Sequence, residues 1–148
     1  MYKHILLPTD GSPLAARGAG AGVKLAEALG AKVAAVYVAM PYAPAVYGDA
    51  AVFYAGPSPK EHKQFSQEAA QKAFAPIEAA ARKAGVACAT LLLFERKPWE
   101  GILKAARSRK CDAIVMASHG RGGLGGVFIG SETQRVLAHS TIPVLVIR

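Results

Sequence analysis

Five short apolar segments alternate along this chain with four longer segments whose apolar residues recur at helical spacing. The apolar segments span 2–7, 32–39, 86–94, 112–118 and 143–147, and the helical patterns span 13–29, 60–84, 98–109 and 131–139. Strands that are apolar on both faces and alternate with helices are typical of a parallel sheet covered on both sides. With right-handed crossovers, this pattern predicts a single doubly wound α/β domain over residues 1–148.

Polar and glycine residues concentrate in the loops that follow the first and fourth predicted strands. Doubly wound sheets bind ligands beyond the carboxyl ends of their strands, where the strand order reverses. If the first and fourth strands are neighbours, these two loops meet. We therefore expect a five-stranded parallel sheet in the order 3-2-1-4-5, with helices on both faces.

Some helix boundaries carry clear local signals. Ser12 and Pro13 are typical of an N-cap and the first helical position, and Gly30 is expected to end that helix. Pro76 lies inside the pattern 60–84, so we expect a kink or a break there. The inward face of this second helix is predicted to carry Phe65, Ala69, Ala73, Ile77, Ala80 and Ala84.

Composition excludes several classes of protein. Hydrophobic residues make up 52% of the chain, which argues against disorder, and no apolar run reaches the ~18 residues that span a bilayer. The segment Met1–Asp10 breaks too early for a signal peptide, so we expect a cytoplasmic protein without membrane partners. Cys88 and Cys111 are too few for a disulfide framework and are expected to be buried free thiols. The cysteines and histidines show no metal-ligand spacing.

The formal net charge of +8 is compatible with phosphate ligands, nucleic acid or anionic membranes. The positive residues are scattered over the predicted outer faces of helices, which indicates solvated surfaces. The chain has no RNA-binding aromatic motif and no zinc-finger spacing, so nucleic acid is an unlikely partner. The loop 40–59 is rich in Pro and Gly yet carries aromatic residues, and its role stays open between connector, cover and interface.

A glycine-dense loop follows the fourth predicted strand. It begins at Ala117-Ser118-His119-Gly120 and, after nine further residues, reaches Gly130-Ser131-Glu132-Thr133 at the start of a helix. Backbone without Cβ atoms lets a bulky anion approach main-chain N–H groups, and the helix N-terminus adds unpaired donors. The loop therefore predicts a phosphate site. Gly130 is expected to lie against the phosphate, where a larger side chain would occupy the space of the phosphate oxygens.

Two familiar phosphate motifs do not explain this loop. Residues 120–125 match G-x-G-x-x-G, but a dinucleotide fingerprint needs a further strand and an acidic residue about 20 positions later. The only acidic residue after this loop is Glu132. The P-loop pattern is also absent, and the last lysine is Lys110, so no lysine follows to neutralise a transferred phosphate.

The chain resembles the universal stress protein family along its whole length. The resemblance rests on Ile5–Ser12, on Asp112–Arg121, on the pair Gly130-Ser131 and on Ile142–Val146. The ATP-binding branch of that family carries G-2x-G-9x-G-[ST]. This chain has Ala117 at the first glycine position and matches the remaining positions.

The resemblance implies a role for each candidate residue. Pro8, Thr9 and Asp10 would line the adenosine end, Val38 would contact adenine through its backbone, and Met116 with Ala117 would flank the ribose. The phosphates would be surrounded by Gly120, Arg121, Gly130, Ser131, Glu132 and Thr133, chiefly through N–H groups and the two hydroxyls. Because Glu132 is negative, a magnesium or manganese ion would accompany ATP.

Each role has a simpler alternative. Asp10 is also a good turn residue, and Ser131 with Gln134 fits an S-x-x-Q capping box that needs no ligand. His119 and Arg121 are also compatible with solvated loop positions.

The resemblance implies a small ATP-binding regulator or sensor in the stress response. One alternative is a slow ATP hydrolase or phosphotransferase, although no general base stands beside a nucleophile and the nearest carboxylates are Asp10 and Glu132. A second alternative is a dimeric interaction module that binds no nucleotide, which Ala117 keeps open. We also expect a homodimer through the apolar edge strand 143–147, with the loop segment 42–54 as the next candidate interface.

Overall fold

The computed structural model describes residues 1–44, 56–119 and 129–148. Its elements in chain order are β1 (His4–Pro8), α1 (Pro13–Leu29), β2 (Lys32–Ala39), α2 (Pro59–Lys83), β3 (Cys88–Phe94), α3 (Pro98–Ser108), β4 (Ala113–Ala117), α4 (Ser131–His139) and β5 (Val144–Ile147). The strands form one parallel sheet in the order β3-β2-β1-β4-β5. The predicted doubly wound fold and its strand order are confirmed.

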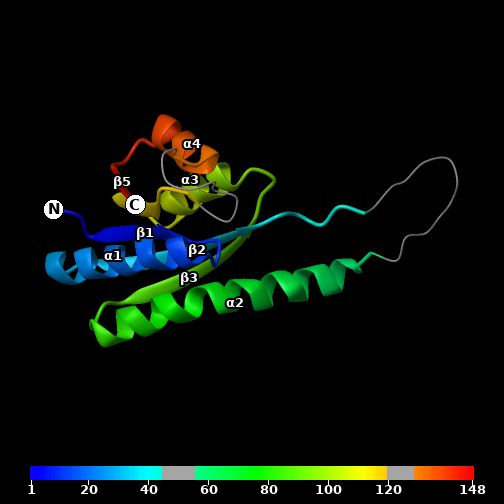
Figure 1. The fold of residues 1–148 in the computed structure, drawn as a ribbon, viewed down its shortest axis with the longest axis horizontal. Helices are drawn as coiled ribbons and strands as arrows, with labels where there is room; N and C mark the ends of the chain where they lie inside the picture. The colour runs from blue at the N-terminus through cyan, green and yellow to red at the C-terminus, as the bar shows by residue number, and fades with distance from the viewer. Residues whose placement is uncertain (45–55, 120–128) are drawn as a thin grey trace, which may run out of the picture.

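Two helices cover each face of the sheet (Figure 1). Successive residues of a strand point to opposite faces, so each strand contributes to two cores. The face under α1 and α2 carries Ile5, Leu7, Val33, Ala35 and Val115. The face under α3 and α4 carries Leu6, Ala34, Val36, Ile114 and Met116.

Helix α1 packs unusually close to the sheet because glycine occupies two buried positions on its inner face. A Cβ atom added at Gly18 would lie 3.0 Å from the backbone N and 3.4 Å from Cβ of Ala117. A Cβ atom at Gly22 would overlap the side chain of Leu7. The methyl group of Ala117 therefore lies against α1, on the face opposite to α3 and α4.

The predicted ends of α1 are confirmed. The Ser12 hydroxyl oxygen accepts a hydrogen bond from the Ala15 N–H, with 3.2 Å between Oγ and N, and Pro13 is the first helical residue. Gly30 ends the helix with φ of 62°, a left-handed conformation that glycine adopts at little cost.

Helix α2 differs from its prediction in two respects. It runs unbroken from Pro59 to Lys83 through Pro76, so of the two expected outcomes, a kink or a break, the break does not occur. Phe65 is 57% exposed, so its predicted inward position is wrong as well. The N-terminal part of α2 extends past the ends of the strands in Figure 1, and the buried residues of this helix begin only at Ala70.

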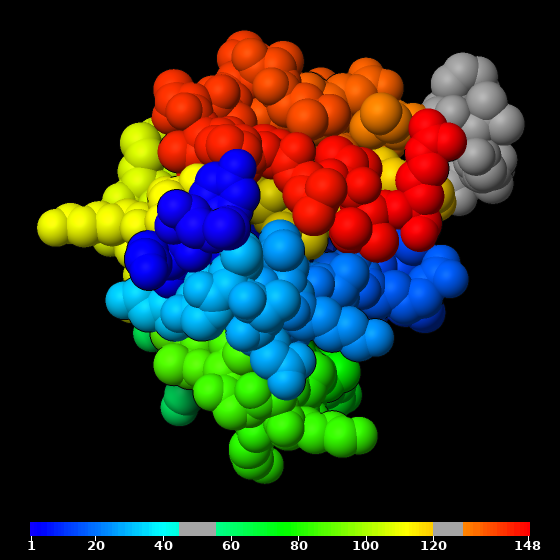
Figure 2. All heavy atoms as spheres, turned by 90° about the vertical axis from the view of Figure 1, so that its left-hand side faces the viewer, coloured from blue at the N-terminus to red at the C-terminus, as the bar shows by residue number. Residues whose placement is uncertain are grey.

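The end-on view in Figure 2 looks at the amino ends of the parallel strands. From top to bottom it shows α4 and the C-terminal residues, the N-terminal residues, the end of α1 and the α2–β3 connection. Cys111 is buried near this end, and burial raises its pKa to about 11. Cys88 is a free thiol too, but it is partly exposed, so its predicted burial is only partly confirmed. No helix in the described ranges combines the length and apolar character that a membrane crossing requires.

Candidate functional site

A cavity of about 350 Å³ opens at the carboxyl ends of β1, β2 and β4, between the N-termini of α3 and α4. Its wall combines apolar side chains with two carboxylates. It is lined by Pro8, Thr9, Asp10, Ala15, Val36, Val38, Pro98, Ile102, Met116, His119, Gly130, Ser131 and Glu132. The structure thus brings eight of the residues named from the sequence to one cavity.

The floor of the cavity is apolar because of strand periodicity. Val36 and Met116 belong to the core under α3 and α4, and Val38 packs against that core. Helix α3 approaches closely here, since a Cβ atom at Gly101 would lie 2.8 Å from Cγ1 of Val38. A flat apolar surface between a sheet and a helix is suited to a planar heterocycle.

Backbone hydrogen bonds hold the end of β1 in place. The Thr9 N–H donates to the Val36 carbonyl oxygen, with 2.9 Å between N and O. The Thr9 hydroxyl oxygen accepts from the Gly11 N–H at 3.1 Å, and Asp10 Oδ1 accepts from the Ser12 N–H at 2.9 Å. Asp10 therefore forms the turn considered as its alternative role and lines the cavity as well.

Gly130 is required by close approach rather than by an unusual backbone angle. Its φ is −60°, which any residue can adopt. Its N–H donates to the Ser118 carbonyl oxygen at 2.7 Å between N and O. A Cβ atom there would lie 3.0 Å from Cβ and 3.1 Å from Cα of His119, so it would press on the loop after β4.

Ser131 begins α4 but does not cap it. The N-cap is Gly130, and Gln134 donates its side-chain Nε2–H to the Ile129 carbonyl oxygen instead. The S-x-x-Q capping box considered as the alternative role of Ser131 does not form. Within the described part of the chain, no side chain caps the first turn of α4. N–H groups in such a first turn can bind solvent or a ligand.

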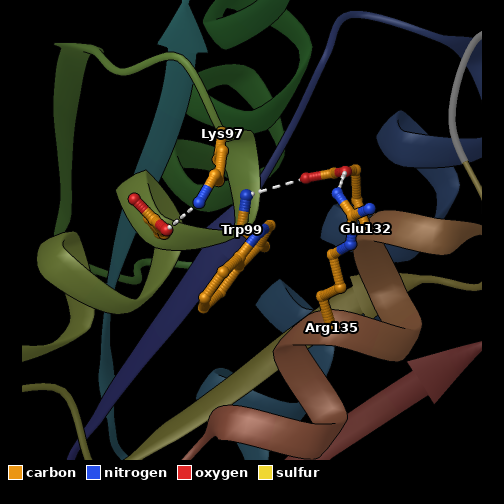
Figure 3. A network of polar contacts seen from close by, with 5 residues as sticks. Lys97, Trp99, Glu132 and Arg135 are labelled. Atoms are coloured by element: carbon orange, nitrogen blue, oxygen red, sulfur yellow. Dashed lines mark hydrogen bonds and ion pairs between the residues drawn. The ribbon is translucent and has the colours of Figure 1, made fainter.

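Glu132 joins the N-termini of α3 and α4 (Figure 3). Its Oε2 accepts a hydrogen bond from the Trp99 N–H at 2.8 Å, and its Oε1 pairs with Arg135 Nη1 at 3.2 Å. The N-cap residue of α3, Lys97, makes no side-chain capping bond. The Trp99 ring also stacks on the His139 ring, with centroids 4.7 Å apart. Glu132 thus supplies from α4 the cap that α3 lacks.

Two described residues named from the sequence, Ala117 and Thr133, do not line the cavity. Ala117 turns its side chain toward α1. Thr133 is buried, and its hydroxyl donates to the Ala117 carbonyl oxygen at 3.1 Å between the two oxygens. These two residues lie behind the lining residues and hold the end of β4 against α1 and α4. Gly120 and Arg121 lie outside the described residues.

Five lining residues were missing from the sequence-based set: Ala15, Val36, Pro98, Ile102 and His119. Val36 precedes Val38 by two positions on one strand, and this spacing places both on the same face. Pro98 had been recognised only as a helix start. Ile102 and Ala15 lie on helices whose approach to the sheet no local pattern reveals.

One histidine, His119, is among the described residues that line the cavity. The Ser118 hydroxyl lies 3.0 Å from Nδ1 of His119, but Ser118 is only 4% exposed and does not line the cavity. Among the described residues, no group of three or more His, Cys, Asp or Glu side chains is placed to hold a metal ion.

Comparisons with known proteins match the whole chain. The model of the universal stress protein family covers residues 1–148. A Thermus aquaticus protein named "Universal stress protein in QAH/OAS sulfhydrylase 3′ region" is 36% identical over 148 residues, 100% of both chains. Universal stress protein MJ0531 of Methanocaldococcus jannaschii is 31% identical over 151 residues, which cover 100% of this chain and 83% of that protein.

Solved structures show the same architecture. The protein MJ0577, also of Methanocaldococcus jannaschii, is 25% identical and superimposes with a TM-score of 0.71, with 99% of this chain and 96% of that chain covered. A universal stress protein in complex with cAMP is 19% identical with a TM-score of 0.69, over 99% and 97% of the two chains. The Archaeoglobus fulgidus protein in complex with dAMP is 21% identical with a TM-score of 0.63, over 99% and 98%.

Proposed function

Because the chain belongs to the universal stress protein family, we propose that its cavity binds an adenine nucleotide and that the protein acts as a nucleotide-dependent regulator or sensor. The observation that supports this most is that one cavity combines an apolar floor with the N-terminus of α4, whose first turn is capped by no described side chain. An apolar surface accepts a base, and uncapped N–H groups at a helix N-terminus accept a phosphate. The adenine nucleotides bound by two proteins of this fold are consistent with the proposal.

The proposed orientation places adenine on the floor formed by Val36, Val38 and Met116. Asp10 and Thr9, at the end of β1, then face the ribose, and Pro8 closes the base end. Gly130 and Ser131 lie at the opposite wall, where the N–H groups of α4 face the phosphate. Gly120 and Arg121 remain proposed phosphate contacts by resemblance. Ala117 and Thr133 act indirectly, by holding the wall.

The alanine at position 117 does not argue against this proposal. Its methyl group packs on Gly18 of α1 and stays out of the cavity. The departure from the ATP-binding motif therefore removes no space that a nucleotide would use. This supports the proposal that the chain belongs to the nucleotide-binding branch of the family, and it argues against the alternative of an interaction module that binds no nucleotide.

We propose that ATP, where it binds, arrives with Mg²⁺ or Mn²⁺. These ions take oxygen ligands, and the described carboxylate nearest the proposed phosphate position is Glu132. The described residues form no three-ligand cluster, so phosphate oxygens and water would complete the coordination.

The protein is proposed to form a homodimer through β5. This strand pairs with β4 on one side only, and Leu145 on it is 48% exposed. An apolar edge strand without charge or proline invites pairing with a second copy.

Two measurements test nucleotide binding. Mass spectrometry of the ligand released from protein purified without added nucleotide should detect an adenine nucleotide. Titration calorimetry should give dissociation constants below about 1 mM for AMP or ATP, equivalent to more than roughly 4 kcal/mol of binding free energy. Absence of both a co-purified ligand and measurable binding of either nucleotide would contradict the proposal.

A further inference from the structure

Two helix N-termini meet at the cavity, and their N–H groups have different partners. Pro98 is the first residue of α3 and Ser131 is the first residue of α4, and both line the cavity. At α3 the Trp99 N–H already donates to Glu132, with 2.8 Å between N and Oε2. The carboxylate thus occupies the position at which a ligand anion would bind to α3. The first turn of α4 has no comparable side-chain cap among the described residues.

Two described cations near Glu132, Arg135 and Lys97, do not line the cavity. Arg135 pairs with Oε1 of Glu132 from the next turn of α4, and its side chain is 53% exposed. Lys97 pairs with Glu100, with 3.0 Å between Nζ and Oε1 (Figure 3). The described lining of the cavity contains Asp10 and Glu132 but neither lysine nor arginine. A phosphate chain that grows along this wall therefore approaches a carboxylate.

We infer that Glu132 determines ligand specificity by charge: the cavity prefers an adenosine ligand with a single phosphate to metal-free ATP. This inference rests on the proposed function. One phosphate fits at the N–H groups of α4. Each further phosphate adds negative charge beside Glu132, in a partly dry cavity where like charges repel more strongly than in water.

The capping role of Glu132 does not by itself require a negative charge. A glutamine side chain also has an oxygen that accepts the hydrogen bond from the Trp99 N–H. Glu132→Gln therefore keeps the cap and removes the charge. Glu100→Gln is the matched control, because Glu100 lies in the first turn of α3, pairs with Lys97 and does not line the cavity.

The experiment measures dissociation constants for adenosine, AMP and ATP in EDTA, for the wild type and both variants. We expect the wild type to bind AMP more tightly than ATP. Glu132→Gln should tighten ATP binding about tenfold, equivalent to about 1.4 kcal/mol, tighten AMP binding less and leave adenosine unchanged. Glu100→Gln should leave all three constants unchanged.

A second measurement needs no variant. Raising the salt concentration from about 0.05 M to about 0.5 M screens charge interactions. If Glu132 repels the phosphate chain, ATP binding should strengthen relative to AMP. If the net electrostatic field of the cavity attracts phosphate instead, the binding of ATP should weaken relative to the binding of AMP, which would contradict the inference.

The outcomes separate this inference from the proposed function. An ATP-to-AMP affinity ratio that is the same in wild type and Glu132→Gln would overturn the role of Glu132 and leave nucleotide binding intact. Equal tightening of adenosine and ATP would show a structural effect and would overturn it as well. If the wild type binds none of the three compounds, the proposed function fails together with it.

Discussion

At the scale of single residues, Gly130 shows how a motif glycine can be needed for a reason other than its backbone angle. Its φ of −60° is open to any residue, but a Cβ atom would lie 3.0 Å from Cβ of His119. Glycine here lets the start of α4 approach the end of β4. The N–H groups proposed to bind phosphate depend on that approach.

Replacement of Gly130 by valine should therefore displace the loop rather than fill the phosphate position. We expect a loss of about 1–3 kcal/mol of unfolding free energy, as in other overpacked sites, and weaker binding of AMP and ATP. Chemical denaturation and calorimetry would measure the two effects. Wild-type stability together with wild-type affinity would show that the close contact has no consequence.

Asp10 and Ser131 allow the proposed orientation of the nucleotide to be tested. Asp10→Ala should weaken the binding of adenosine, AMP and ATP by similar factors, because Asp10 is placed at the ribose, which all three share. Ser131→Ala should weaken the binding of AMP and ATP and leave adenosine binding unchanged, because Ser131 is placed beside the phosphate at the N-terminus of α4. Each lost hydrogen bond should cost roughly 0.5–3 kcal/mol of binding free energy. Asp10→Asn, which keeps an oxygen for the Ser12 N–H, controls for the turn. A loss confined to ATP in Asp10→Ala would mean that the orientation is reversed.

At the scale of elements, α1 packs closely against β4 because glycine occupies the contact position. Gly18 and Gly20 lie two positions apart on this helix, but their surroundings differ. A Cβ atom at Gly18 would lie 3.0 Å from the backbone N of Ala117, whereas one at Gly20 would meet nothing within 4 Å. Backbone atoms of a central strand cannot move aside as a flexible side chain can.

The two glycines form a matched pair for mutation. Gly20→Ala should stabilise the protein by about 0.5–1 kcal/mol, because alanine favours the helix interior. Gly18→Ala should destabilise it by about 1–3 kcal/mol, because the added methyl group pushes α1 away from β4. Urea denaturation of both variants gives the two free energies. A stabilised Gly18→Ala would show that α1 can shift at no cost.

At the scale of the whole molecule, the order β3-β2-β1-β4-β5 leaves β5 at an edge of the sheet with Leu145 exposed. The apolar strand 143–147 was predicted from the sequence as a dimer interface. Leu145 is a suitable probe of it, because its side chain is already 48% exposed and a charge there disturbs little of the core.

We expect the wild type to sediment as a dimer and Leu145→Lys to sediment as a monomer. Leu137→Lys is the control, because Leu137 is 42% exposed on α4 rather than on β5. Analytical ultracentrifugation at tens of micromolar would compare the three proteins. A monomeric wild type would end the proposal. A dimer that survives Leu145→Lys would move the interface to another surface.

The sequence alone determined the alternation of strands and helices, the ends of α1 and the strand order. These features depend on local periodicity, on caps and on the rule that ligands bind where strand order reverses. Eight of the residues around the cavity were named from the resemblance to the universal stress proteins. The exposed start of α2 was not predictable, because helical spacing does not reveal how far a helix extends beyond its sheet.

Only the tertiary structure decided which motif residues face the cavity and which face away. Ala117 packs on Gly18, Gly130 lies against His119, and Glu132 caps α3 through Trp99, 33 residues away in the chain. Each of these contacts depends on the distance and direction between two elements. Local sequence patterns predict whether a segment is a helix or a strand and which of its faces is buried. The distance and direction between two elements are determined only when the side chains of the two cores pack together.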